Sequence, residues 1–267
     1  MSFRLAPYLI AAAVTASASI AHAGPPFWMN DLRVDNRVGV EMSLGNPPGP
    51  VGDSLTINSD VFGKFAVGNN LLLGFRVPLA ISFFDDAIDG DDSGAALGNI
   101  GLNVTGVTLL SRGRTAMRAG LGGTLYLNTV SDGIDSGAVA SSAALLAIPD
   151  QGRWANATTF RGRGDFIVQS DAFFLQTELN LDLLFRDGDD DVDLAIGFGP
   201  GVDVSSNLAL QLEISVANIT DNSLIVLDLG MRYQTRGFVF GGRVYLPTEE
   251  LGGEDVVGLG LDFSGRF

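Results

Sequence analysis

Apolar side chains recur at every second position along most of this chain, and the pattern persists to the last residue. The positions between them are mostly small or charged. Successive side chains of a β-strand point to opposite faces, whereas a helix repeats every ~3.6 residues. The pattern therefore predicts strands with one apolar face and one polar face. In the final segment the apolar set consists of Val257, Leu259, Leu261, Phe263, Gly265 and Phe267.

The same alternation marks about twelve segments, each of roughly 8 to 15 residues, with boundaries good to a few positions. Strands that cross a bilayer at a tilt need about 9–11 residues, whereas strands of soluble proteins are most often about 5–6 residues long. The segment lengths therefore favour membrane-crossing strands. The segments lie at 36–45, 54–67, 70–84, 98–110, 114–128, 158–170, 172–186, 191–204, 207–218, 223–235, 237–247 and 256–267.

The connections between these segments alternate in length. Short ones, such as Gly68-Asn69, Asp171 and Arg236, follow the even-numbered segments, and longer ones, such as 85–97 and 129–157, follow the odd-numbered segments. A transmembrane barrel has short periplasmic turns and longer extracellular loops. We therefore predict an all-β fold, a transmembrane antiparallel up-and-down β-barrel of about 12 strands, within a range of about 10 to 14.

The amino-terminal residues indicate export. Met1–Arg4 carries one positive charge, Leu5–Val14 is mostly apolar, and Ala21-His22-Ala23 is a small-residue cleavage pattern. These features predict a signal peptide over residues 1–23, cleaved after Ala23. The export pathway leads to an oxidising compartment, yet the chain has no cysteine with which to form a disulfide.

The mature chain divides into two parts. Residues 36–267 are expected to form the barrel, and residues 24–35 to form a periplasmic amino-terminal segment. Pro25 and Pro26 bar a regular strand in this segment, and Phe27 and Trp28 are apolar. The segment is therefore expected to be either a small plug in the barrel or an aromatic anchor at the membrane interface.

The leader, the alternating segments and the carboxyl-terminal strand together resemble bacterial outer-membrane β-barrel proteins. That resemblance implies location in the bacterial outer membrane, contact with lipid and lipopolysaccharide, and recognition of the last strand by the barrel-assembly machinery through Phe263 and Phe267. More narrowly, Gly24–Phe27 and Leu97–Leu102 are similar to the transporter-like outer-membrane family named for the MetA pathway of phenol degradation. The narrower resemblance implies passage of apolar or aromatic solutes.

In such a barrel the apolar side chains face lipid and the alternate set faces the lumen. The lumen set holds similar numbers of basic and acidic residues, so the net charge of −15 is carried by the loops. One interpretation is a polar path for a solute; the alternative is a lumen filled by cross-strand ion pairs. The residues expected to line a path are Arg76, Arg118, Arg161, Arg163, Arg232, Arg243, Asp60, Asp165, Glu178 and Asp228.

The longest connection, 129–157, contains the uncharged apolar stretch Ala138–Ile148, which is compatible with a helix. An apolar loop is unfavourable in water, so we expect it to fold into the barrel mouth or against the rim. It is either a constriction of the path or a cap that covers apolar surface.

Acidic residues cluster in three of the longer connections. Calcium prefers several oxygen ligands, but neither aspartate run ends in the glutamate that closes an EF-hand loop. We therefore expect solvated loops that bridge lipid headgroups through divalent ions, without a specific metal site. The weak candidates for calcium ligands are Asp85, Asp86, Asp89, Asp187 and Asp189.

The chain contains one histidine, His22, and no cysteine. Because His22 leaves with the signal peptide, the mature chain lacks the usual general base and the thiol nucleophile. We therefore expect no enzymatic activity and no cofactor. The strongly acidic composition also opposes nucleic-acid binding.

The sequence therefore predicts an outer-membrane channel or transporter for passive passage of small molecules, with apolar or aromatic solutes as the class implied by the narrower resemblance. The alternative is a structural or surface-interaction barrel with a filled lumen. In that case the acidic loops would bind divalent ions, lipopolysaccharide or a partner protein.

Overall fold

The computed structural model describes residues 32–49, 52–84, 92–111, 115–130, 134–147, 150–186, 190–217, 223–247 and 257–267. Within these ranges lie one α-helix, α2 (Ile134–Leu145), and one 3-10 helix, η1 (Gln151–Arg153), between β7 and β8. No helix of the described part is long and apolar enough to cross a membrane. The strands are β1 (Arg37–Gly45), β2 (Pro48–Gly49), β3 (Gly52–Val67), β4 (Leu71–Phe84), β5 (Asp92–Leu97), β6 (Ile100–Ser111), β7 (Thr115–Leu127), β8 (Thr158–Ser170), β9 (Phe173–Phe185), β10 (Asp191–Asp203), β11 (Leu208–Ala217), β12 (Leu224–Gln234), β13 (Phe238–Pro247) and β14 (Gly258–Arg266).

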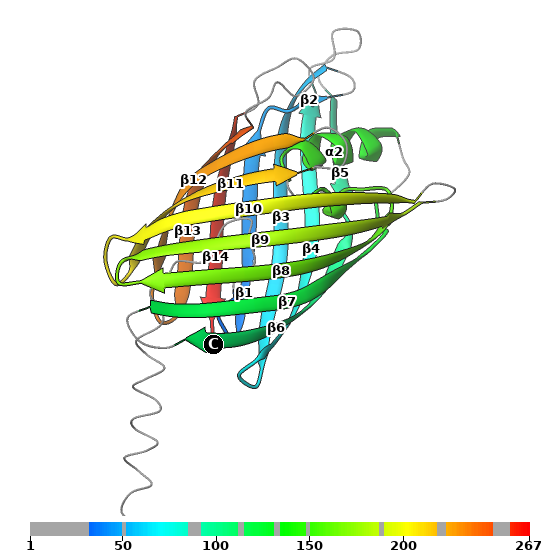
Figure 1. The fold of residues 1–267 in the computed structure, drawn as a ribbon. Coiled ribbons are helices and arrows are strands. Elements are labelled where there is room, and N and C mark those ends of the chain that lie inside the picture. The colour runs from blue at the N-terminus through cyan, green and yellow to red at the C-terminus, as the bar shows by residue number, and fades with distance from the viewer. Residues whose placement is uncertain are drawn as a thin grey trace, which may run out of the picture.

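The strands form one antiparallel sheet that closes into a barrel of twelve strands (Figure 1). Its first and last strands, β1 and β14, pair from Arg37↔Arg266 to Gly45↔Gly258. β2 forms a short hairpin with the start of β3. β5 and β6 both pair with β4, so they make one barrel strand with a break at Gly98-Asn99. The predicted fold and strand number are confirmed, and closure gives both β1 and β4 a partner on each side.

Two connections are shorter than the sequence predicts. The prediction of a loop over 85–97 is wrong for its second part, which is strand β5 and pairs with β4 as far as Phe84↔Asp92. The prediction of a loop over 46–53 is also wrong in part, because it contains β2 and the start of β3. Backbone hydrogen bonds extend both hairpins, and these bonds do not require alternating side-chain hydropathy.

Side chains on the outer face of the barrel are apolar and exposed, whereas those on the inner face are mostly polar and buried. Leu121, Leu229 and Phe263 are 77%, 61% and 56% exposed, but Thr56 and Glu213 are completely buried. A water-soluble domain has the opposite arrangement, with its large apolar side chains inside. The exposed apolar band is the surface that a membrane barrel presents to lipid.

The tight turns gather at the end of the barrel that holds the carboxyl terminus, here called the turn end (Figure 1). Gly68 and Asp171 in these turns have positive φ angles of 66° and 49°. Glycine adopts this left-handed conformation without steric cost, and aspartate tolerates it better than most residues. The opposite end, here called the loop end, encloses α2.

Candidate functional site

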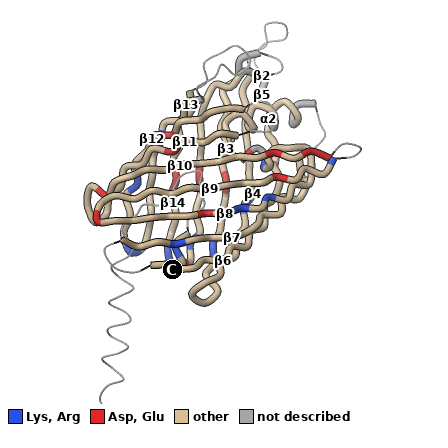
Figure 2. Tube along the Cα trace, viewed as in Figure 1, with Lys and Arg blue, Asp and Glu red and all other residues tan. Residues whose placement is uncertain are grey.

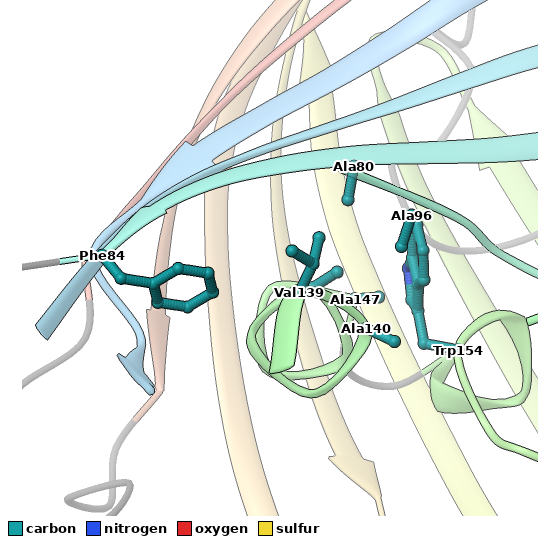
Figure 3. Close-up of a cluster of buried hydrophobic side chains, with 8 residues drawn as sticks. Ala80, Phe84, Ala96, Val139, Ala140, Ala147 and Trp154 are labelled. Carbon is teal, nitrogen blue, oxygen red and sulfur yellow. The ribbon is translucent and has the colours of Figure 1, made fainter. Parts of the chain in front are cut away.

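Helix α2 lies inside the barrel at the loop end. Its residues Val139 and Ala143 are fully buried against the inner side chains of β4 and β5, which include Ala80 and Ala96 (Figure 3). Trp154, which follows η1, completes this cluster. Small side chains on both surfaces let the helix approach the wall closely, so the helix sits on the wall through shape and dispersion contacts.

After the helix, the chain crosses to the opposite wall. Tyr245 Oη donates a hydrogen bond of 2.8 Å to the carbonyl of Leu145, and Asn58 Nδ2 donates one of 2.9 Å to the carbonyl of Ala143. The segment therefore spans the lumen between β3 and β13. Beyond these bonds, Leu146 is buried among inner side chains of β10–β13, namely Ala195, Ala217, Leu224, Val226 and Tyr245.

Asp150, at the end of this crossing, is the centre of a buried polar cluster. Its carboxylate accepts a hydrogen bond from Tyr126 Oη at 2.7 Å and lies 2.7 Å from nitrogens of both Arg153 and Arg161. Arg161 in turn forms a bidentate pair with Asp182, at 2.6 and 2.5 Å. Burial alone would raise the pKa of Asp150, but the guanidinium groups of Arg161 and Arg153 outweigh it and hold that pKa well below its usual range.

Arg153 connects this cluster to β3. Its guanidinium pairs with Asp60, which also lies 2.9 Å from Arg76 Nη1. The same Arg76 nitrogen lies 2.8 Å from Glu41 on β1. Residues 150–153 are therefore held to β3, β7 and β8 by charge-assisted bonds, which are stronger than neutral hydrogen bonds.

The break between β5 and β6 fixes the segment after η1. Asn99, which is completely buried, donates from Nδ2 to the carbonyls of Gly152 and Ala155 at 3.0 and 2.6 Å. Its backbone amide donates to the carbonyl of Arg153 at 2.6 Å. At Gly98 an added Cβ would lie 2.7 Å from that same carbonyl, so only glycine permits this approach. The stretch Leu97–Leu102, which carries the narrower family resemblance, thus holds the loop inside the barrel.

A second cluster closes around the amino-terminal segment at the turn end. Asp35 lies 2.6 Å from Arg37, 2.8 Å from Lys64 and 3.1 Å from Arg266. Leu32 is buried with inner side chains that include Leu72 and Val107. Residues 32–35 therefore pack inside the barrel, against its wall. The expected signal peptide and most of the expected plug or anchor fall in residues 1–31, which lie outside the described residues.

The structure places the predicted path residues on the inner wall, but groups only some of them. Arg76, Asp60 and Arg161 join the cluster around residues 150–153. Figure 2 shows positive and negative positions distributed along the strands between the two ends. Arg118 lies on another part of the inner wall, where it is opposite Ile167 of β8.

The remaining predicted residues form separate pairs. On β8, Arg163 lies 3.5 Å from Asp165, and Asp165 faces Glu178 across the β8–β9 pair. The other residues lie on β12 and β13: Arg232 bonds Asp262 of β14 at 3.0 Å, and Arg243 lies 3.9 Å from Asp228. An added Cβ at Gly241 would lie within 2.0 Å of Asp262 Oδ1, so this glycine lets Arg232 reach across β13.

Sequence reasoning missed Asp150, Arg153, Asn99 and Asp35. Asp150, Arg153 and Asp35 lie outside the predicted strands, so alternation could not assign them to the lumen. Asn99 lies in the predicted segment 98–110, but the structure places it at the break between β5 and β6. Asp150 and Arg153 did leave one signal, since they directly follow the uncharged apolar stretch Ala138–Ile148.

The structure describes the residues of the predicted insertion signal but not the candidate metal ligands. Phe263 and Phe267 lie on the outer face and are 56% and 73% exposed. The ring of Phe267 meets that of Phe65 edge to face, with centroids 6.3 Å apart. No group of three or more metal-ligating side chains occurs among the described residues. The calcium candidates Asp85, Asp86, Asp89, Asp187 and Asp189 lie outside those residues.

Comparison with known structures places the fold among outer-membrane β-barrels. The chain is similar to the COG4313 outer membrane channel from Pseudomonas putida F1, with a TM-score of 0.65 and 11% identity over 92% of this chain and 100% of that one. It is also similar to the transport unit of the autotransporter AIDA-I from Escherichia coli, with a TM-score of 0.52 and 11% identity over 100% of this chain and 99% of that one.

A weaker similarity involves an enzyme. The outer membrane phospholipase A from Escherichia coli has a TM-score of 0.45 and 11% identity, over 86% of this chain and 90% of that one. Similarities at these identities establish the fold and not the activity. No protein-family model and no curated protein matches the sequence, so the resemblance to the phenol-degradation family remains a resemblance.

Proposed function

We propose that this protein is an outer-membrane channel for passive passage of small molecules, and that residues 134–157 constrict its lumen. The observation that carries the proposal is the placement of α2. A segment that connects two adjacent strands does not extend away from the barrel, but enters the lumen and contacts both walls. A constriction of this kind leaves the wall complete and controls what passes.

The barrel wall does not depend on that segment. β7 and β8 pair continuously from Thr115↔Ser170 to Tyr126↔Thr159, immediately before and after it. Backbone hydrogen bonds of the ladder are satisfied between the strands themselves, as a membrane barrel requires. Residues 134–147 can therefore move, or be removed, without opening the wall.

The solute class remains part of the proposal. Inner side chains near α2 and Leu146 include the apolar Phe84, Val226 and Leu224 and the polar Ser54 and Asn58. A mouth that combines apolar and polar side chains suits solutes that combine an apolar or aromatic body with a polar group. The narrower family resemblance supports the same class. We expect no hydrolysis by this barrel, because the expected mature chain lacks histidine and cysteine.

A second candidate function has its own support. The inner carboxylates and guanidinium groups are extensively paired with one another, as at Arg161 and Asp182 or Arg232 and Asp262. A lumen filled in this way also suits a structural barrel, whose loops bind ions, lipopolysaccharide or a partner. The two candidates differ in whether the protein conducts.

Single-channel conductance in planar bilayers separates the two candidates. The full mature chain is compared with a variant in which residues 134–147 are replaced by a short glycine–serine linker. This variant keeps Asp150 and Arg153, so the buried polar cluster remains. Ser141→Ala is the matched control, because Ser141 is on the exposed side of α2.

We expect conductance steps that appear or grow at least about tenfold in the linker variant, because pore conductance follows the open cross-section. The Ser141→Ala protein should behave as the native chain. Silence of the native and linker proteins, with folding verified by heat-modifiable gel mobility, would instead support the structural barrel.

A further inference from the structure

The barrel wall caps the carboxyl-terminal end of α2. The last four carbonyl groups of an α-helix have no partner within the helix. In α2 the carbonyl of Ala143 accepts a hydrogen bond of 2.9 Å from Asn58 of β3. The carbonyl of Leu145 accepts one of 2.8 Å from Tyr245 of β13. The cap therefore comes from two strands that are distant from the helix in the sequence, and the two bonds are named here the latch.

Two glycines of the wall leave room for this contact. Gly45 of β1 and Gly258 of β14 pair with each other at the loop end. An added Cβ at Gly258 would lie 3.0 Å from the ring of Tyr245, and one at Gly45 would lie 2.6 Å from Leu146. The Tyr245 ring and the Leu146 side chain therefore rest on bare backbone, and the wall lies close to the end of α2.

Apolar packing surrounds the bond from Tyr245. Tyr245 is 3% exposed and packs with Leu146, Leu224 and Val226. A carbonyl in such surroundings is costly to leave without a donor. The Leu145 carbonyl is therefore expected to give up its bond when Leu146 leaves the cluster and water enters. The bond and the packing are thus released together.

The described contacts of α2 with β3 are also neutral. Ser142 is completely buried, and its hydroxyl oxygen lies 3.4 Å from that of Ser54. A helix of twelve residues is marginal in water by itself. Once the latch is lost, α2 is therefore expected to leave the wall and unwind, which exposes Ser142 to water.

We propose that the latch is the gate control of this channel. Release of Leu145 by Tyr245 and of Ala143 by Asn58 frees residues 134–147 from the wall, while residues 150–157 stay anchored. Tyr245 is thus a positioning residue that sets how often the lumen opens. The inference rests on the proposed channel function and names the regulation of its constriction.

The test follows the chemical labelling of a single buried thiol. The chain has no cysteine, so Ser142→Cys introduces its only thiol. A water-soluble maleimide reaches this thiol when α2 leaves the wall, so the labelling rate reports the open population. Addition of Tyr245→Phe removes the hydroxyl and keeps the ring. This change should raise the labelling rate about fivefold, the factor to which the net contribution of one hydrogen bond corresponds.

Three controls separate the latch from other causes. Tyr233→Phe removes a hydroxyl from the outer face, where Tyr233 is 44% exposed, and should change the rate by less than about twofold. The thiol of Ser141→Cys lies on the exposed side of α2 and should react equally fast with and without Tyr245→Phe. The thiol of Ser264→Cys is buried on β14 near the turn end and should stay protected in both, because the barrel itself does not loosen.

A second variant, Asn58→Ala, removes the other bond of the latch and should also accelerate the labelling of Ser142→Cys. An unchanged rate in either variant would overturn that residue's part in the latch. Equal acceleration at Ser142→Cys and Ser264→Cys would overturn the latch as a whole, because the barrel would then be loosening.

Planar-bilayer recordings of the same variants distinguish the latch from the channel function. Faster labelling together with more frequent openings would support both. Faster labelling of a protein that stays silent would support the latch and overturn the proposed channel. More frequent openings without faster labelling would keep the channel and overturn the latch.

Discussion

The two halves of the segment inside the barrel are held by different forces. Residues 150–157 are bound by buried ion pairs and by the amide of Asn99. Residues 134–147 form no ion pair among the described residues and rest on the wall through small apolar side chains and a few neutral hydrogen bonds, such as that from Asn58 to the carbonyl of Ala143. Charge-assisted bonds have strict geometry and are costly to break one at a time. Dispersion contacts between alanines and valines are individually weak, and neutral hydrogen bonds are weaker than charge-assisted ones. The first half is therefore an anchor, and the second is the half suited to move.

The largest effect should come from the anchor. Arg161→Met removes the cation shared by Asp150 and Asp182 and leaves both buried carboxylates with less compensation. We expect a loss of about 3 to 5 kcal/mol in the free energy of unfolding, measured by urea titration in detergent micelles. Arg186→Met is the matched control and should change this free energy by less than about 0.5 kcal/mol, because Arg186 is exposed.

A smaller loss should follow from Asn99→Ala. The change removes the donor to the carbonyls of Gly152 and Ala155, which leaves buried acceptors without a partner. We expect a loss of about 2 to 3 kcal/mol by the same titration. Asn128→Ala removes one exposed hydrogen bond to Asn156 and should cost far less. Equal losses in the two variants would contradict the anchoring role of Asn99.

The movable half should respond in conductance more than in stability. Ala143 is fully buried, so Ala143→Leu overfills the contact between α2 and the wall. We expect a stability loss of only about 1 to 2 kcal/mol, together with more frequent open events in bilayer recordings as α2 is displaced. Ser141→Leu adds the same bulk on the exposed side of the helix and should leave gating unchanged. A closed channel in the Ala143→Leu protein would contradict the assignment of α2 as the mobile half.

The smallest effect is expected from pH. The pKa of Asp150 lies below its usual range, so the anchor's contribution to stability is fully present above the unfolded value of about 3.9 and is lost only as pH falls through the depressed value. The chain has one histidine, His22, within the expected signal peptide. Conductance and unfolding free energy should therefore be constant between about pH 5 and pH 8. A transition near pH 6 would point to a titrating group outside this anchor.

The barrel was predictable because its signal is local. Alternation between neighbours decides which side chains of a strand share a face, and turn lengths decide which strands are adjacent. Strand positions, closure and the inward direction of Asp60 or Arg161 follow from these two features. The sequence analysis did not predict β5, because a hairpin extends wherever backbone groups can pair, whatever the side chains are.

The contents of the lumen depend on contacts between residues far apart in the chain. The sequence predicts that Ala138–Ile148 is covered, since an uncharged apolar stretch is unfavourable in water. The surface that covers this stretch and the partners that hold it depend on the closed barrel. Arg153 meets Asp60 and Tyr126 meets Asp150 because the closed wall brings these strands around one segment. Such pairing depends on distances across the barrel, and no periodicity along the chain encodes those distances.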